Sequence, residues 1–175
     1  MRQAVERKRD AERAADIVRD AGGKVVGRTR LQKIAYLLEA AGLGEGFAFE
    51  YRHYGPYSEE LANAAWHAAL LGVIHEEERP TSWGGSYSVF TAGGARSGMV
   101  PPARLALVRA AVQADPVALE LAATAAFLAA EGNPDPWAET ERRKPEKAAI
   151  RINEAKALYR ALQQVDTPRR LPKIA

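Results

Sequence analysis

The sequence predicts a mainly α, α+β protein. Its N-terminal part is expected to be winged helix-turn-helix-like with a β-hairpin wing, and its C-terminal part helical. Apolar residues recur at helical spacing along most of the 175 residues. Two extended runs flank a turn-rich segment and predict a hairpin, and up to there the order is helix, helix, strand, helix, strand, strand. We therefore expect a winged-helix-like domain over residues 1–95. Residues 96–175 should form a helical extension that packs on it or makes a small second lobe.

The first two helices are predicted from their apolar spacing and from the residues at their ends. Residues 3–21 carry a weak apolar stripe, which Gly22-Gly23 ends. In the second helix, Thr29 and Gln32 have the spacing of a capping box, in which each side chain satisfies the other's backbone donor. Gly42 is placed to end this helix with a left-handed cap. Its apolar face consists of Leu31, Ile34, Ala35 and Leu38.

A strand, a sharp turn and a third helix are predicted next. Residues 47–54 alternate in polarity as a half-buried strand does, and Gly55-Pro56 is expected to break that strand. Ser58 is a natural N-cap for a helix that ends at Gly72. Two glutamates lie in the first turn of this helix, where the helix dipole favours acidic side chains.

The hairpin that follows is predicted to present an aromatic side chain at its tip. Its second strand covers Ser86 to Thr91, and Trp83 lies in the glycine-rich turn before it. Trp83 is the best candidate for an exposed interface aromatic, whereas Trp66 and Trp137 sit in apolar helical patterns and are expected in the core. Beyond the hairpin, Asp115-Pro116 predicts the cap and first residue of a further helix.

Composition excludes several classes of protein. Hydrophobic residues make up 47% and charged residues 27% of the chain, as in ordinary globular proteins. There is no cysteine, which rules out disulfides, thiolate metal sites and a cysteine nucleophile. The longest apolar stretch is too short to span a bilayer, and the N-terminus lacks the apolar core of a secretory signal. We expect a cytoplasmic protein that does not engage membranes.

No motif predicts catalysis. The sequence has no phosphate-binding glycine loop and no His-Glu-x-x-His, and its three histidines lack the spacing of a metal site. We expect a protein that is not an enzyme, with no catalytic residues, no cofactor and no metal.

Basic residues concentrate toward the C-terminal end and leave a nucleic-acid-binding function open. Residues 141–175 contain ten basic and four acidic side chains, so this segment carries +6 and the first 140 residues −3. Such an end attracts phosphate or an acidic partner, or it is a solvated helix face. The helix before the hairpin has no lysine or arginine, and the first hairpin strand contains Glu76, Glu77 and Glu78, which argues against duplex contact there. The candidate nucleic-acid-binding residues are Arg28, Arg30, Lys33, Arg142, Arg143, Lys144, Lys147 and Arg151.

Two motifs carry a family resemblance. The first motif is Gly27–Leu38 (GRTRLQKIAYLL), and the second is Tyr54–Leu61 (YGPYSEEL). With these two motifs in this order, the chain resembles the YwgA-type family of uncharacterised bacterial proteins. More distantly it resembles Panacea-type antitoxin domains, which share an LQK helix and a YGP turn. That resemblance implies a binding role in toxin–antitoxin or defence systems. The motifs also have a structural interpretation, in which Gln32 and Lys33 hydrogen-bond the YGP turn.

Two hypotheses remain open. The first is a non-catalytic winged-helix-like module that binds a partner protein, which the resemblance suggests is a toxin or defence effector. The second is a DNA-binding regulator, which would need a homodimer to recognise a palindrome. The candidate partner-binding residues are Arg28, Arg30, Lys33, Arg52, His53, Tyr54, Tyr57 and Trp83.

Overall fold

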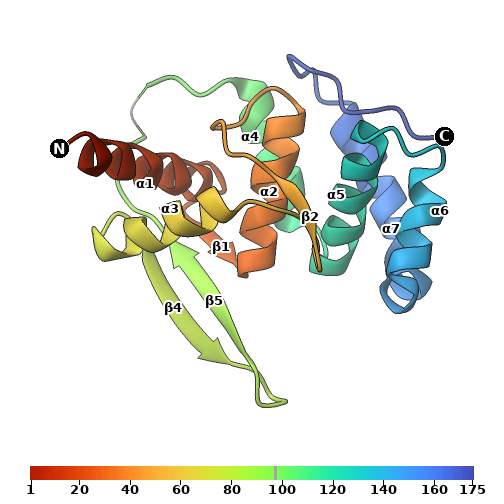
Figure 1. The fold of residues 1–175 in the computed structure, drawn as a ribbon, viewed down its shortest axis with the longest axis horizontal. Coiled ribbons are helices and arrows are strands. Elements are labelled where there is room, and N and C mark those ends of the chain that lie inside the picture. Colours follow the sequence, from red (N-terminus) through yellow and green to blue (C-terminus); the bar gives the residue numbers. More distant parts are fainter. Residues whose placement is uncertain (97) are drawn as a thin grey trace.

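Helices and short strands alternate in the first part of the chain, as Figure 1 shows. The computed structural model describes residues 1–96 and 98–175. Its elements up to residue 91 are α1 (Arg2–Asp20), β1 (Lys24–Val26), α2 (Arg28–Ala40), β2 (Glu50–Arg52), β3 (Gly55–Tyr57), α3 (Glu59–Leu70), β4 (His75–Pro80) and β5 (Ser86–Thr91).

The second part of the chain is helical. It contains α4 (Pro102–Gln113), α5 (Pro116–Ala130), α6 (Pro136–Arg143) and α7 (Pro145–Gln163). The expectation of a mainly α, α+β protein is therefore confirmed. Among the residues described, no helix combines the length and the apolar character that a membrane span needs.

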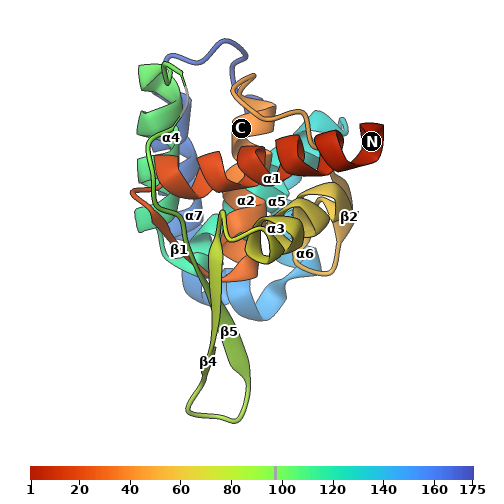
Figure 2. The same ribbon diagram turned by 90° about the vertical axis from the view of Figure 1, so that its left-hand side faces the viewer.

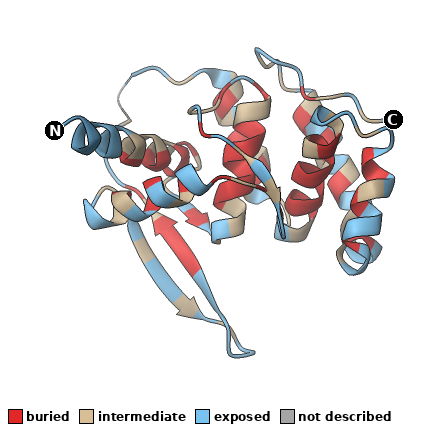
Figure 3. Ribbon diagram, in the orientation of Figure 1, coloured by how far each residue is buried: buried red, intermediate tan, exposed pale blue. Residues whose placement is uncertain are grey.

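Two small antiparallel sheets accompany the helices. The first has the strand order β1-β5-β4, so the segment Lys24–Val26 is a paired strand rather than a simple link. Val25 and Glu76 both lie opposite Phe90, on the face of this sheet that meets the helices. The far half of the β4–β5 hairpin projects from the body in both views (Figures 1 and 2) and is largely exposed (Figure 3).

One hydrophobic core extends through both parts of the chain, from Ala11 to Leu171. The buried helix α5 packs against α2 on one side and against α6 and α7 on the other (Figure 1). On the opposite side of α2, α1 packs along α3, and the buried residues of both helices there are mostly alanines, including Ala11, Ala14, Ala64 and Ala68. The helices of the C-terminal part therefore share their core with the N-terminal part.

Local signals at the helix ends are confirmed in most places. The Ser58 hydroxyl accepts a hydrogen bond from the Leu61 amide at 3.1 Å, and Asp115 caps α5. Gly42 follows α2 in the left-handed region, with φ at +74°. The predicted capping box is wrong: the N-cap of α2 is Gly27, with no side-chain hydrogen bond, because Gln32 is used elsewhere.

The predicted strand does end before Gly55-Pro56, since β2 stops at Arg52, but the sequence did not predict that Gly55 and Pro56 begin a second strand. These residues open β3, which turns back and pairs with β2, with Tyr51 opposite Pro56. Pro56 has no amide hydrogen to donate to the ladder, and a proline is tolerated in this short pair because both strands are edge strands. Gly55 makes the turn at a φ of +94°, and a Cβ there would lie 2.5 Å from the Thr124 hydroxyl.

Candidate functional site

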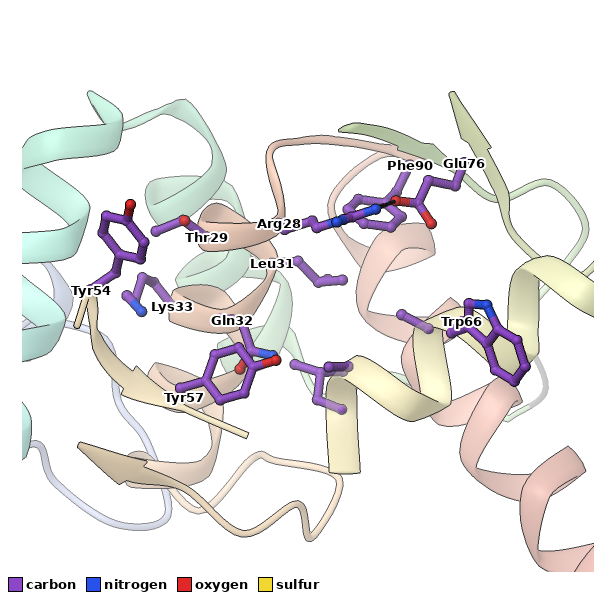
Figure 4. A pocket seen from close by; sticks show the side chains of 13 residues that line it. Arg28, Thr29, Leu31, Gln32, Lys33, Tyr54, Tyr57, Trp66, Glu76 and Phe90 are labelled. Carbon is purple, nitrogen blue, oxygen red and sulfur yellow. Dashed lines mark hydrogen bonds and ion pairs between the residues drawn. The ribbon is translucent and has the colours of Figure 1, made fainter. Parts of the chain in front are cut away.

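A groove lies between α2, α3, the β2–β3 turn and the root of the β4–β5 hairpin (Figure 4). Its volume is about 510 Å³, and Tyr54 and Trp66 stand at opposite ends in the close view. A hollow of about 390 Å³ shares Arg28, Trp66 and Glu76 with it and continues along α3 to Leu70. The residues that line the larger groove are Arg28, Thr29, Leu31, Gln32, Lys33, Tyr54, Tyr57, Leu61, Ala62, Ala65, Trp66, Glu76 and Phe90.

The helix α3 presents two apolar faces, and only one of them is covered. Ala64 and Ala68 are buried on the α1 side. The other face carries Ala62, Trp66, Ala69 and Leu70 at helical spacing along the groove and its extension. Ala65 also lines the groove but is itself buried. Trp66 is 57% exposed and Leu70 65% exposed. The expectation that Trp66 lies in the core is therefore wrong, while Trp137 is buried as expected.

One rim of the groove carries an ion pair between α2 and the hairpin. The Arg28 guanidinium donates to the Glu76 carboxylate at 2.7 Å, and the Ser88 hydroxyl donates to the same oxygen at 2.7 Å. Partial burial acts to raise the pKa of Glu76, but the hydrogen bonds from Ser88 and Arg28 outweigh it and lower that pKa. Arg28 is therefore ion-paired within the chain, although its side chain stays 67% exposed.

The β2–β3 turn at the other end of the groove is held by the two residues that the LQK motif contributes. The Gln32 side chain donates to the Ser58 carbonyl at 2.9 Å and accepts from the Ser58 amide at 2.8 Å. The Lys33 ammonium, with its residue 1% exposed, donates to the Pro56 carbonyl at 2.8 Å. Desolvation is the main cause that lowers the pKa of Lys33 to about 8. Hydrogen bonding of the turn by Gln32 and Lys33 is thus observed.

The basic residues after α6 reach the same turn from its other side. Lys144 and Lys147 both donate to the buried Glu120 carboxylate, at 2.8 and 2.9 Å. Lys144 also donates to the His53 carbonyl at 3.1 Å, and the Lys147 ammonium lies 4.9 Å from the centre of the Tyr54 ring. Two of the candidate nucleic-acid-binding lysines are therefore engaged inside the molecule.

The remaining candidate cations are also paired. Arg30 donates to three carbonyls at the end of α4, the shortest being Ala114 at 2.7 Å. Arg52 binds Glu59 at 3.1 Å and lies over the Tyr57 ring. Arg142 and Arg143 share Glu139, and Arg151 contacts Asp115 and Glu154.

The structure thus brings together some predicted site residues and separates others. Arg28, Lys33, Tyr54 and Tyr57 line the groove. Trp83 is 84% exposed at the hairpin tip, outside that lining. The sequence interpretation missed Trp66 as a site residue. The available signal was that α3 carries alanines on more than one face, so a single neighbouring helix would not cover all of its apolar surface. In the part of the chain that the structure describes, no group of three or more histidine or acidic side chains is placed to hold a metal ion.

Comparison with known proteins gives one short likeness. No family model and no solved structure matches the chain. Over 54 residues it is 35% identical to the uncharacterised protein YwgA of Bacillus subtilis strain 168. The match covers 31% of this chain and 32% of YwgA, so the chain spans about a third of that protein's length. The chain is therefore similar to YwgA over one segment.

Proposed function

We propose that this chain is a non-catalytic, winged-helix-like module that binds a partner protein in the groove between α3 and the hairpin. The observation that carries the proposal is the exposed apolar face of α3, with Trp66 and Leu70 uncovered beside a groove of about 510 Å³. An exposed tryptophan beside an apolar hollow is the kind of anchor that dominates protein interfaces.

The arrangement of elements supports the winged-helix description. The chain runs α1, β1, α2, α3, β4, β5, with the β2–β3 turn placed between α2 and α3. The strand order β1-β5-β4 joins the first strand to the hairpin, as a wing requires. In DNA-binding versions of this arrangement, the helix that corresponds to α3 enters the major groove.

Charge argues that α3 serves a protein rather than a duplex. Its sequence contains no lysine or arginine, and β4 beside it carries Glu76, Glu77 and Glu78. Carboxylates at this position repel phosphate, whereas duplex affinity comes mainly from lysine and arginine side chains that contact phosphates. The candidate nucleic-acid-binding cations are tied to carboxylates or backbone carbonyls of the chain itself.

The nature of the partner rests on resemblance. The likeness to YwgA, an uncharacterised protein, names no partner. The more distant resemblance of the LQK and YGP motifs to Panacea-type antitoxin domains favours a toxin or defence effector. Non-covalent binding of a protein of that kind fits a groove in which Leu31, Leu61, Ala62, Ala65, Trp66 and Phe90 provide an apolar lining.

The test compares the tagged wild-type chain with single variants in its native host. We expect a captured protein that rebinds after purification, and we expect Trp66→Ala to weaken that binding by about tenfold. The double variant Arg142→Ala, Arg143→Ala should bind as the wild type does. The alternative, a DNA-binding regulator, predicts tight binding of a labelled duplex that falls steeply with salt and depends on Arg142 and Arg143. That result, with no effect of Trp66→Ala, would overturn the proposal.

A further inference from the structure

We infer that the groove takes an amphipathic helix of the partner, laid along α3 on the face opposite α1, with a lysine or arginine set against Glu78. This inference rests on the proposed function, because it names what enters the same groove. The inference depends on the exposed face of α3, on the way α1 packs against the other face of α3, and on the charges along β4.

The packing of α1 shows what α3 accepts. The α1–α3 interface is built largely from alanines, among them Ala11, Ala14, Ala64 and Ala68, each at most 2% exposed. Small side chains let two helix axes approach to roughly 8–10 Å. The opposite face of α3 also carries small side chains, Ala62 and Ala69, and both are partly exposed.

The groove adds the walls that such a helix needs. Trp66 and Leu70 are four residues apart on α3, so they lie on one side of the helix, one turn from each other. Leu31 and Phe90 line the groove from α2 and from the sheet. Apolar side chains spaced at about three and four residues on an incoming helix would contact these surfaces in succession.

An extended segment fits this site less well. It would have to pair with the outer edge of β4, where three successive residues are glutamates and Pro80 lacks an amide hydrogen. The apolar contacts available are spaced along a helix, at every third and fourth residue of α3, and not alternately along a strand.

The charges along β4 determine which charge is favoured on the incoming helix beside its apolar stripe. Glu76 is bound by Arg28, and Glu77 is bound by Arg79 at 3.0 Å. Among the residues that the structure describes, Glu78 has no cation within ion-pair distance and accepts only a long hydrogen bond of 3.5 Å from Ser86. Glu78 lines the extension of the groove beside Trp66 and Leu70. A basic residue next to the apolar stripe of the incoming helix would complete this site.

The experiment displays two peptide libraries of about 18 residues against the full chain. One library encodes amphipathic helices with a fixed apolar stripe and a flank randomised among lysine, glutamate and glutamine. The other encodes alternating, strand-forming peptides with the same composition. Enriched peptides are then synthesised and their dissociation constants measured by fluorescence anisotropy.

We expect helical peptides with a basic flank to be enriched. Trp66→Ala should weaken them by about tenfold, and Glu78→Gln by about threefold. The matched control is Ile150→Ala, which removes a large apolar side chain that is 70% exposed on α7, outside the groove, and should leave binding unchanged. Circular dichroism of each variant checks that the fold is retained.

Each other outcome contradicts the inference in a recognisable way. Enrichment of strand-forming or acid-flanked peptides that still depend on Trp66 would overturn the helix or the charge while leaving the proposed function standing. Helical peptides that ignore Trp66→Ala, or no enrichment of helices at all, would overturn the inference, and the capture experiment would then decide the proposed function by itself.

Discussion

Gly55 shows at the level of one residue why the YGP turn tolerates no side chain. Its φ is +94°, and an added Cβ would lie 2.5 Å from the Thr124 hydroxyl on the buried helix α5. We expect Gly55→Ala to lower the free energy of unfolding by about 2–4 kcal/mol, from backbone strain and the clash together. Urea denaturation measures this value.

The matched control for that change is Gly46→Ala. Gly46 has a φ of +85°, but nothing lies within 4 Å of its added Cβ. This variant carries the backbone strain without the clash, so it should cost roughly 1 kcal/mol. Equal losses for the two variants would show that contact with Thr124 contributes nothing.

Lys33 predicts how stability changes with pH. Burial lowers its pKa in the folded chain to about 8, against 10.5 in the unfolded chain. Between these values the unfolded state binds more protons, so stability rises as the pH increases. From pH 7.5 to 9.5 we expect a gain of roughly 1–2 kcal/mol in the free energy of unfolding.

The variant Lys33→Met isolates this effect, because it keeps an unbranched side chain only one atom shorter and removes the titrating group. Its free energy of unfolding should change little between the same two pH values. Tyr36 and Tyr159 have raised pKa values through burial, and they destabilise the fold only at higher pH, where unfolded tyrosines ionise. A rise of the same size in Lys33→Met would assign the pH dependence to other groups.

At the scale of elements, the start of α3 depends on a contact from α2. Ser58 is fully buried, and its amide and carbonyl are both satisfied by the Gln32 side chain. Gln32→Ala would leave the buried Ser58 amide without a partner, while the Ser58 carbonyl would keep only the hydrogen bond from the Ala62 amide at 3.1 Å. We therefore expect a loss of about 1–3 kcal/mol in the free energy of unfolding, measured by urea denaturation. Thr29→Ala should cost little, because Thr29 makes no cap hydrogen bond in α2. A large effect of Thr29→Ala with a small one for Gln32→Ala would restore the capping box.

The same elements show which parts of the fold could be predicted from the sequence. Helix ends at Gly42, Ser58 and Asp115 were predictable, because glycine conformation and N-capping are local properties. The role of Gln32 was not, because its spacing from Thr29 fits a local cap equally well and only the tertiary fold brings Ser58 to it. β3 was missed because a Gly-Pro pair normally ends a strand.

The candidate site was predictable only in part, for a related reason. The motifs pointed to Arg28, Lys33, Tyr54 and Tyr57, and these do line one groove. Trp66 was assigned to the core because an apolar position on a helix does not reveal which face a neighbour covers. Both faces of α3 are apolar, and α1 covers only one of them.

At the scale of the whole molecule, part of the excess positive charge of the C-terminal segment is balanced inside the fold. A C-terminal segment with +6 suggested an outward surface for phosphate. In the fold, Lys144 and Lys147 from this segment converge on Glu120, which lies on the buried helix α5. The sequence could not reveal this, because the acid precedes the lysines by more than twenty residues and lies in an alanine-rich, apolar stretch.

Glu120 therefore ties α6 and α7 to the helix at the centre of the core and, through Lys144 and Lys147, to the turn that bears Tyr54. Glu120→Gln would remove the carboxylate that binds both ammonium groups and leave the buried Lys144 without its ion-pair partner. We expect a loss of about 3–5 kcal/mol in the free energy of unfolding. The control Glu139→Gln breaks pairs with Arg142 and Arg143 at the surface and should change stability little. Similar losses for both variants would mean that the buried pair is no more important than the surface pair, and that apolar packing alone joins the C-terminal helices to the groove.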